Sequence, residues 1–187
     1  NCALILIDHQ PFQFAGLPTF GSFQAAGATS RCSRTKWAFS VMRSVVGSNR
    51  PKLYWTVMAA QALRAIPVPV YSDSVADELA FVLAHADVKF VAAQDQELVD
   101  KVLSVSERVP HLHQVFYDEP RGLDDYDQSR LIAIHDVIED GRAAHAANAA
   151  LGGQIDEIIR QGEGSDISII LYTSGTTKDP KGVVHTH

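Results

Sequence analysis

Cysteine is nearly absent from this chain of 187 residues, which contains only Cys2 and Cys32. Two cysteines make neither a disulfide framework nor a zinc cluster, so we expect two reduced thiols in a cytoplasmic protein. Long apolar stretches are also missing, since no run approaches the roughly 18–20 apolar residues that span a bilayer. The apolar run Cys2–Ile7 has no basic flank and is followed by Asp8, so no signal peptide and no transmembrane segment are expected.

Positive charge is in short supply, because 16 Lys and Arg stand against 22 Asp and Glu, for a net charge of −6. This balance argues against nucleic acid as a partner, which requires clustered positive charge. The charge is uneven, with +4 in residues 1–50 and −10 in residues 51–187, and six of the 15 aromatic residues precede residue 40. We therefore expect residues 1–43 to be an atypical segment, joined by fusion or frameshift to a partial domain over residues 44–187.

From residue 44 onward, apolar patterns typical of strands and helices alternate. Such alternation predicts an α/β fold with a mostly parallel sheet and helices on its faces. Pro67 and Pro69 cannot donate to a strand ladder, so the segment that contains them is expected to be either an edge strand of the sheet or an extended crossover. Strands are predicted over residues 44–47, 66–71, 89–93, 114–117 and 167–172. Helices are predicted over residues 53–64, 75–85, 96–109, 133–139 and 143–160. Ser74 is expected to be the N-cap of the helix over 75–85.

The segment Thr173–Val183 (TSGTTKDPKGV) carries the residues that indicate chemistry. Hydroxyls and backbone amides can ring phosphate oxygens, a lysine adds a positive charge, and a glycine permits close approach of the backbone. We expect this loop to follow a buried strand of the parallel sheet, where such sheets bind their ligands. The loop lacks the Gly-Lys-Ser/Thr of a Walker A motif, and the chain has no GxGxxG turn. The alternative is a hairpin turn rich in Thr and Ser without a ligand, against which the added Pro-Lys-Gly-Val argues.

The pattern TSGTT-x-x-PKGV resembles the nucleotide-binding signature of the adenylate-forming (AMP-binding) superfamily. Upstream, Asn49-Arg50-Pro51, Ile66–Tyr71 and Tyr117–Leu123 resemble bacterial long-chain fatty-acid CoA ligases. The resemblance covers residues 44–187 and implies part of the family's large N-terminal domain. It also implies an enzyme that uses ATP with Mg²⁺ to activate a fatty acid as an acyl-adenylate and then transfers the acyl group to coenzyme A.

The resemblance further implies a set of nucleotide-binding residues: Thr173, Ser174, Gly175, Thr176, Thr177, Lys181 and Gly182. The family's later motifs are not found before His187, so we expect no complete catalytic set in this chain and no activity from it alone. The alternative is a non-catalytic relic, or a fragment that binds nucleotide weakly. No metal site is expected, because His185 and His187 lack a third ligand at suitable spacing.

Residues 2–14 (CALILIDHQPFQF) faintly resemble the first strand of isochorismatase-like hydrolases, in which Asp8 would be the general base. No cysteine follows Cys32 to serve as the nucleophile of such an enzyme, so this alternative explains the chain poorly. Trp37 and Phe39 leave peripheral membrane contact open, although no amphipathic pattern surrounds them. The sequence does not indicate an oligomeric state or an acyl chain length.

Lys178 stands where the family usually has glycine. If that position is left-handed, a lysine costs about 1–2 kcal/mol there and crowds the loop. We therefore expect Lys178→Gly to raise the affinity for ATP, measured by isothermal titration calorimetry. An unchanged affinity would show that the lysine is neutral at this position.

Overall fold

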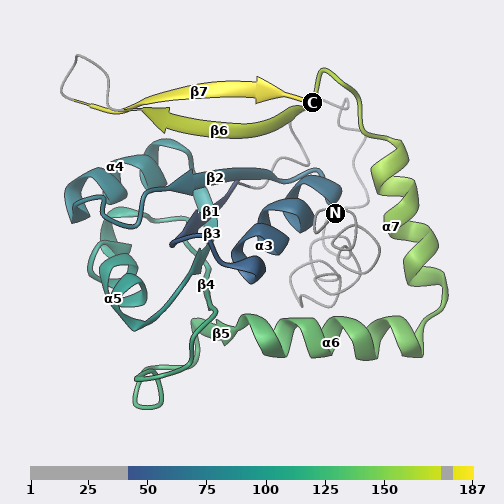
Figure 1. Cartoon of the computed structure of the whole chain (residues 1–187), viewed down its shortest axis with the longest axis horizontal. Coiled ribbons are helices and arrows are strands. Elements are labelled where there is room, and N and C mark those ends of the chain that lie inside the picture. The colour runs from purple at the N-terminus through teal and green to yellow at the C-terminus, as the bar shows by residue number, and fades with distance from the viewer. Residues whose placement is uncertain (1–41, 174–178) are drawn as a thin grey trace.

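The computed structural model describes residues 42–173 and 179–187. Its central feature is a sheet of five parallel strands in the order β2-β1-β3-β4-β5 (Figure 1). The strands are β1 Met42–Val46, β2 Ile66–Val70, β3 Val88–Ala93, β4 Gln114–Tyr117 and β5 Leu131–Ala133. The predicted α/β class with a mostly parallel sheet is confirmed, and so is the edge position of the strand that contains Pro67 and Pro69.

Helices follow four of the five parallel strands, and an antiparallel hairpin lies beside the sheet (Figure 1). The helices are α3 Pro51–Ala62, α4 Ala76–His85, α5 Gln96–Ser104, α6 Ile134–Ala147 and α7 Ala150–Arg160, with a 3₁₀ turn η2 at Ser106–Arg108. The hairpin consists of β6 Ile167–Thr173 and β7 Lys181–Thr186. Among the helices described, none is long and apolar enough to cross a membrane.

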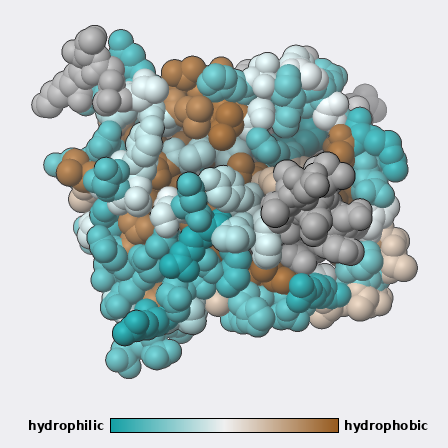
Figure 2. Space-filling view, viewed as in Figure 1, coloured by the Kyte–Doolittle hydropathy of each residue, from teal (hydrophilic) through white to brown (hydrophobic). Residues whose placement is uncertain are grey.

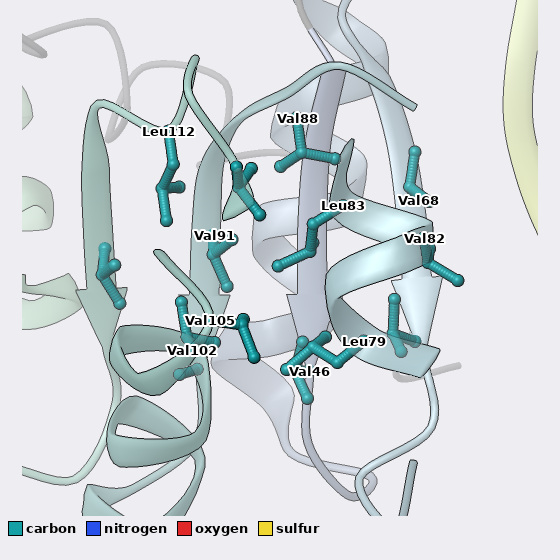
Figure 3. Close-up of a cluster of buried hydrophobic side chains, with 14 of the residues drawn as sticks. Val46, Val68, Leu79, Val82, Leu83, Val88, Val91, Val102, Val105 and Leu112 are labelled. Carbon is teal, nitrogen blue, oxygen red and sulfur yellow. The ribbon is translucent and has the colours of Figure 1, made fainter. Parts of the chain in front are cut away.

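Side chains of the parallel strands alternate between two apolar clusters, one on each face of the sheet. Val46 and Val91 belong to the larger cluster, whereas their neighbours Val45 and Phe90 belong to the smaller one. Helices α4 and α5 complete the larger cluster with Leu79, Leu83, Val99 and Val102 (Figure 3), and α3 and α6 complete the smaller one with Leu53, Ile134 and Val137. Burial on both faces explains why these strands are rich in valine and have few polar residues.

Several helix boundaries differ from those predicted. The helix predicted over 133–139 continues without a break to Ala147, across the gap predicted at 140–142. The helix predicted over 143–160 is interrupted at Asn148, whose backbone is extended (φ −137°, ψ 92°) and whose Oδ1 accepts the N–H of Ala150 at 3.1 Å. Asparagine favours such local bonds over a continuing helix. Ser74 is not the N-cap of α4: Val75 holds that position without a side-chain bond, and Ser74 is buried.

The end of α5 and the strand β5 also differ from the sequence-based expectation. The helix predicted over 96–109 ends at Ser104, and a separate 3₁₀ turn, η2, follows at Ser106–Arg108. The three-residue strand β5 was not predicted, because so short a run carries no detectable period.

Leu79 offers a test of the core, because its side chain is 0% exposed within the larger cluster. We expect Leu79→Ala to lower the free energy of unfolding by about 2–5 kcal/mol, since it removes buried methyl groups and leaves a cavity. Urea denaturation followed by circular dichroism measures this change. The matched control is Val75→Ala just before the same helix, where the side chain is 66% exposed and the expected change is below about 0.5 kcal/mol. Equal effects of the two substitutions would contradict the packing described here.

Candidate functional site

The TSGTT segment connects the two strands of the β6–β7 hairpin. Thr173 ends β6, Lys181 begins β7, and the two residues are paired across the hairpin. The next pair along the hairpin is Tyr172 with Gly182. Of the residues predicted to bind nucleotide, Ser174, Gly175, Thr176 and Thr177 lie outside the described residues, as does Lys178. The structure therefore describes both strand ends from which the loop departs.

The expectation that this loop follows a buried strand of the parallel sheet is wrong. β6 pairs with β7 in a separate antiparallel sheet, and only Ile170 among its residues is buried. The apolar run Ile167–Tyr172 is typical of a strand, but its composition does not show which sheet the strand joins. The alternative prediction is a hairpin turn without a ligand. The structure does contain a hairpin here, formed by β6 and β7.

β6 lies beside the edge strand β2 but does not extend its sheet (Figure 1). Alternate residues of a strand direct their backbone groups to the same edge. Because proline has no N–H, the ladder with β1 must use Ile66, Val68 and Val70, which leaves Pro67 and Pro69 on the outer edge. This edge therefore lacks two N–H donors, and β6 cannot pair with it as a regular strand.

Side chains hold the start of β6 against the C-terminal end of α3. Gln61 donates from Nε2 to the backbone oxygen of Ser168 at 3.1 Å and to its Oγ at 3.0 Å. Arg64 pairs with the carboxylate of Asp166 at 2.9 Å. The N–H of Glu163 also donates to this carboxylate, and this bond, followed by the Arg64 charge, lowers the pKa of Asp166 below its ordinary value of 3.8.

Arg64 reaches Asp166 from an unusual backbone conformation. It follows α3 at the position where glycine is common, with φ at 57°. Its N–H bonds to the oxygen of Gln61, and the N–H of Ala65 bonds to that of Ala60, which closes the end of the helix. The left-handed conformation costs an arginine about 1–2 kcal/mol. The ion pair with Asp166 offsets part of this cost and links the end of α3 to the hairpin.

Lys181 is exposed, and the described residues provide no ion-pair partner for it. Its ammonium group is therefore available to a ligand at the base of the loop. Apolar side chains are also exposed on the hairpin, and Figure 2 shows brown surface over it. Leu171 and its cross-strand partner Val183 are 38% and 43% exposed, and Val184, on the opposite face of the hairpin, is 53% exposed.

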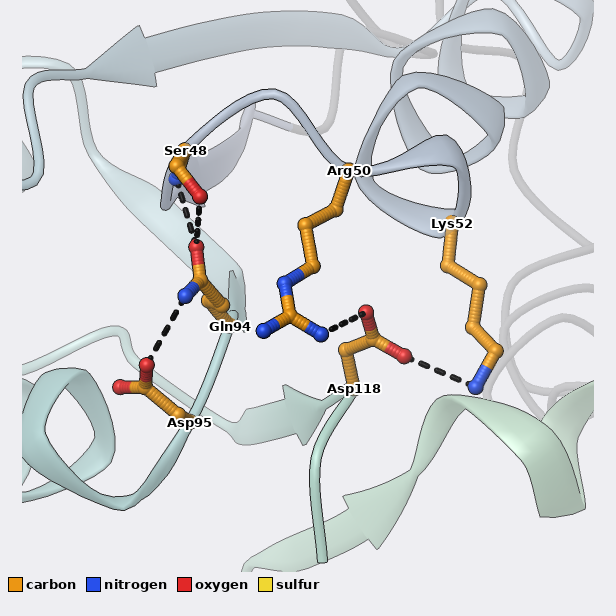
Figure 4. Close-up of polar contacts among 6 residues, drawn as sticks. All are labelled: Ser48, Arg50, Lys52, Gln94, Asp95 and Asp118. Atoms are coloured by element: carbon orange, nitrogen blue, oxygen red, sulfur yellow. Dashed lines mark hydrogen bonds and ion pairs between the residues drawn. The ribbon is translucent and has the colours of Figure 1, made fainter.

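A second group of polar residues lies where β1, β3 and β4 end, near the point at which the strand order changes direction between β1 and β3. Gln94 accepts through Oε1 from the N–H of Ser48 at 2.7 Å and from its Oγ at 2.5 Å (Figure 4). Asp118, largely buried, pairs with Lys52 at 2.8 Å and lies 4.0 Å from Arg50. These residues bond to one another and join the strand ends, so the group stabilises this end of the sheet rather than presenting free polar side chains to a ligand.

The residues that anchor the hairpin were not identified from the sequence. Gln61 and Ser168 are 107 positions apart, and Arg64 and Asp166 are 102 positions apart. The one local signal is an arginine where glycine commonly follows a helix. It marks an unusual backbone position, but it does not indicate the partner.

Comparison with known proteins identifies the family. The chain matches the AMP-binding enzyme family over residues 44–187 and belongs to it, which confirms the resemblance inferred from TSGTT-x-x-PKGV. The human long-chain-fatty-acid–CoA ligase ACSBG2 is 25% identical over 145 residues, and long chain acyl-CoA synthetase 3 of Arabidopsis thaliana is 24% identical over 153 residues. Each match covers 76% of this chain and about a fifth of the relative (20% and 21%).

Solved structures confirm the fold. The anthranilate CoA ligase AuaEII in complex with anthranoyl-AMP superimposes with a TM-score of 0.63 at 16% identity, over 95% of this chain and 28% of that structure. The N-terminal domain of FACL13 from Mycobacterium tuberculosis gives a TM-score of 0.60 at 22% identity, over 97% of this chain and 36% of that one.

Asp166 provides a test of the hairpin anchor through pH. Folding lowers the pKa of Asp166, so its ion pair stabilises the fold above the unfolded value of 3.8, and this contribution is lost as the pH falls through the lowered folded value. We expect wild type to be more stable than Asp166→Asn at about pH 6, with the difference narrowing towards about pH 3. Urea denaturation across this pH range measures the difference in the free energy of unfolding between the two proteins.

Asp156→Asn is the matched control, because Asp156 is exposed on α7 and has no bonding partner within the described residues. The free energy of unfolding of Asp156→Asn is expected to differ from that of wild type by the same amount across this pH range. A constant difference for Asp166→Asn as well would show that the carboxylate does not anchor the hairpin.

Proposed function

We propose that this chain is the phosphate-binding part of an ATP-dependent ligase that joins a long-chain fatty acid to coenzyme A. The observation that carries the proposal is the cross-strand pair Thr173–Lys181, which brings a hydroxyl together with an ammonium group that has no ion-pair partner among residues 42–173 and 179–187, where the TSGTT loop begins and ends. Family membership over residues 44–187 supports the use of a nucleotide. The names of the curated relatives support a long-chain fatty acid as the acyl substrate.

In the proposed reaction, the fatty-acid carboxylate attacks the α-phosphorus of ATP. The bond between that phosphorus and the bridging oxygen to the β-phosphate breaks, and pyrophosphate leaves with its electron pair. The thiol of coenzyme A then attacks the acyl carbonyl, loses its proton and displaces AMP. Most of the negative charge that must be held is therefore on the β- and γ-phosphates.

The residues of the hairpin suit that charge. The hydroxyl of Thr173 can donate to a phosphate oxygen, and Lys181 supplies a positive charge that favours binding of ATP and departure of pyrophosphate. Ser174, Thr176 and Thr177 are proposed to add further hydroxyl donors, and Gly175 to allow the backbone to approach. Mg²⁺ is expected to accompany ATP. Because the described residues bring together no group of three His, Cys, Asp or Glu, no step is assigned to a metal bound by this chain.

Lys181→Ala tests the phosphate site directly. A charge-assisted contact contributes about 1.5–3 kcal/mol, so we expect the affinity for Mg-ATP to fall by roughly tenfold or more. Isothermal titration calorimetry measures the dissociation constant. The matched control is Arg121→Ala, which removes an exposed cation from the turn after β4 and is expected to leave the affinity unchanged. Equal affinity of Lys181→Ala and wild type would overturn the proposed site.

A further inference from the structure

Tyr172, immediately before the loop, contacts helix α4 through both its hydroxyl and its ring. Its hydroxyl lies 2.6 Å from Nδ1 of His85, the last residue of α4. The His85 ring is held in turn by Phe81, one turn earlier in α4, with ring centroids 5.3 Å apart and planes 19° apart. The Tyr172 ring also meets the edge of the His85 ring, at 5.8 Å and 88°. Tyr172 therefore connects the loop end of β6 to α4, a helix that packs on the parallel sheet.

Gly182 provides the space for this arrangement. It is the cross-strand partner of Tyr172, and a Cβ at position 182 would lie 3.2 Å from Cζ of Tyr172 and 3.2 Å from Cγ2 of Ile170. Such distances are shorter than ordinary van der Waals contact, so a side chain here would push the Tyr172 ring away from His85. The glycine of the signature thus has a packing role beside the tyrosine.

The hairpin has few other contacts near its loop end. A two-stranded hairpin is marginally stable by itself, and Ile170 is the only residue of β6 that is buried. Gln61 and Arg64 hold the beginning of β6, several residues before the loop. Among the described contacts of the strand, the one between Tyr172 and His85 lies nearest to the Thr173–Lys181 pair.

We propose that Tyr172, His85 and Gly182 form a positioning unit that orients the ends of the phosphate loop relative to the parallel domain. The three residues act through Thr173 and Lys181, to which Tyr172 and Gly182 are directly bonded in the chain. This inference rests on the proposed function, because its main test measures the affinity of the chain for ATP. Burial raises the pKa of Tyr172, so its hydroxyl keeps its proton at neutral pH and can donate to Nδ1 of His85.

A double-mutant cycle tests the unit in the full chain. Tyr172→Phe removes the hydroxyl and keeps the ring, and His85→Ala removes its partner. We expect each to weaken Mg-ATP affinity by about three- to tenfold, the effect of one lost hydrogen bond, and the double variant to be no weaker than either single one. Gly182→Ala is expected to weaken affinity at least as much. Additive effects, or no effect, would overturn the proposal.

The matched control is Tyr126→Phe, which removes another tyrosine hydroxyl, bonded to Asp100 at 2.6 Å and to Gln96 at 3.0 Å away from the hairpin. It is expected to leave ATP affinity unchanged. Thermal unfolding of all variants separates a general loss of stability from misplacement of the loop. If Tyr126→Phe lowers both stability and affinity as Tyr172→Phe does, the role of Tyr172 is structural and the proposal fails.

Hydrogen exchange measured by mass spectrometry gives a readout that does not depend on ATP. We expect Tyr172→Phe and His85→Ala to speed exchange in β6 and β7 while leaving β1, β3 and β4 unchanged. If wild type does not bind ATP, the proposed function fails, and exchange in the hairpin alone decides the positioning unit. Unchanged exchange in β6 and β7 would overturn it.

Discussion

The outer edge of β2 lacks two backbone N–H groups because positions 67 and 69 are proline, and the way in which the β6–β7 hairpin attaches to the rest of the structure depends on this. A strand with free donors at this edge would accept β6 as a sixth strand and fix its position by backbone bonds. Here β6 lies alongside without pairing, so its position is left to side chains. Gln61, Arg64 and His85 make the polar contacts, and Ile170 of β6 packs into the larger apolar cluster.

The parallel sheet and the β6–β7 hairpin are stabilised in different ways. The parallel sheet is stabilised by apolar burial on both faces, whereas the hairpin contributes one buried residue and three side-chain attachments. The loop therefore joins two strands whose residues are mostly partly or fully exposed. The side-chain attachments of the hairpin hold β6 close to the parallel sheet. Contacts that act on the ends of the loop are then expected to affect nucleotide affinity more than they affect the stability of the sheet.

Much of the parallel domain is predictable from local pattern, because a valine-rich strand followed by a helix is a short-range signal. The strand with Pro67 and Pro69 is the clearest case, since two missing donors exclude it from the centre of any sheet. Ile167–Tyr172 is the opposite case. Its apolar composition indicates a strand correctly, but the burial expected for it is found only at Ile170. The period of a strand shows which residues share a face, and it does not show which strand is the neighbour.

The sequence by itself determined the family, the α/β class and the types of residue in the loop, because each of these is encoded by nearby residues at short spacing. Only the tertiary structure decided that the loop joins an antiparallel hairpin, that Gly182 packs beside Tyr172, and that Arg64, His85 and Gln61 hold the hairpin. The contacts of Arg64, His85 and Gln61 with the hairpin and its approach join residues 87 to 107 positions apart in the chain. No local pattern encodes such pairs, since they form only when the edge of β2, the ends of α3 and α4, and the hairpin are brought together by folding.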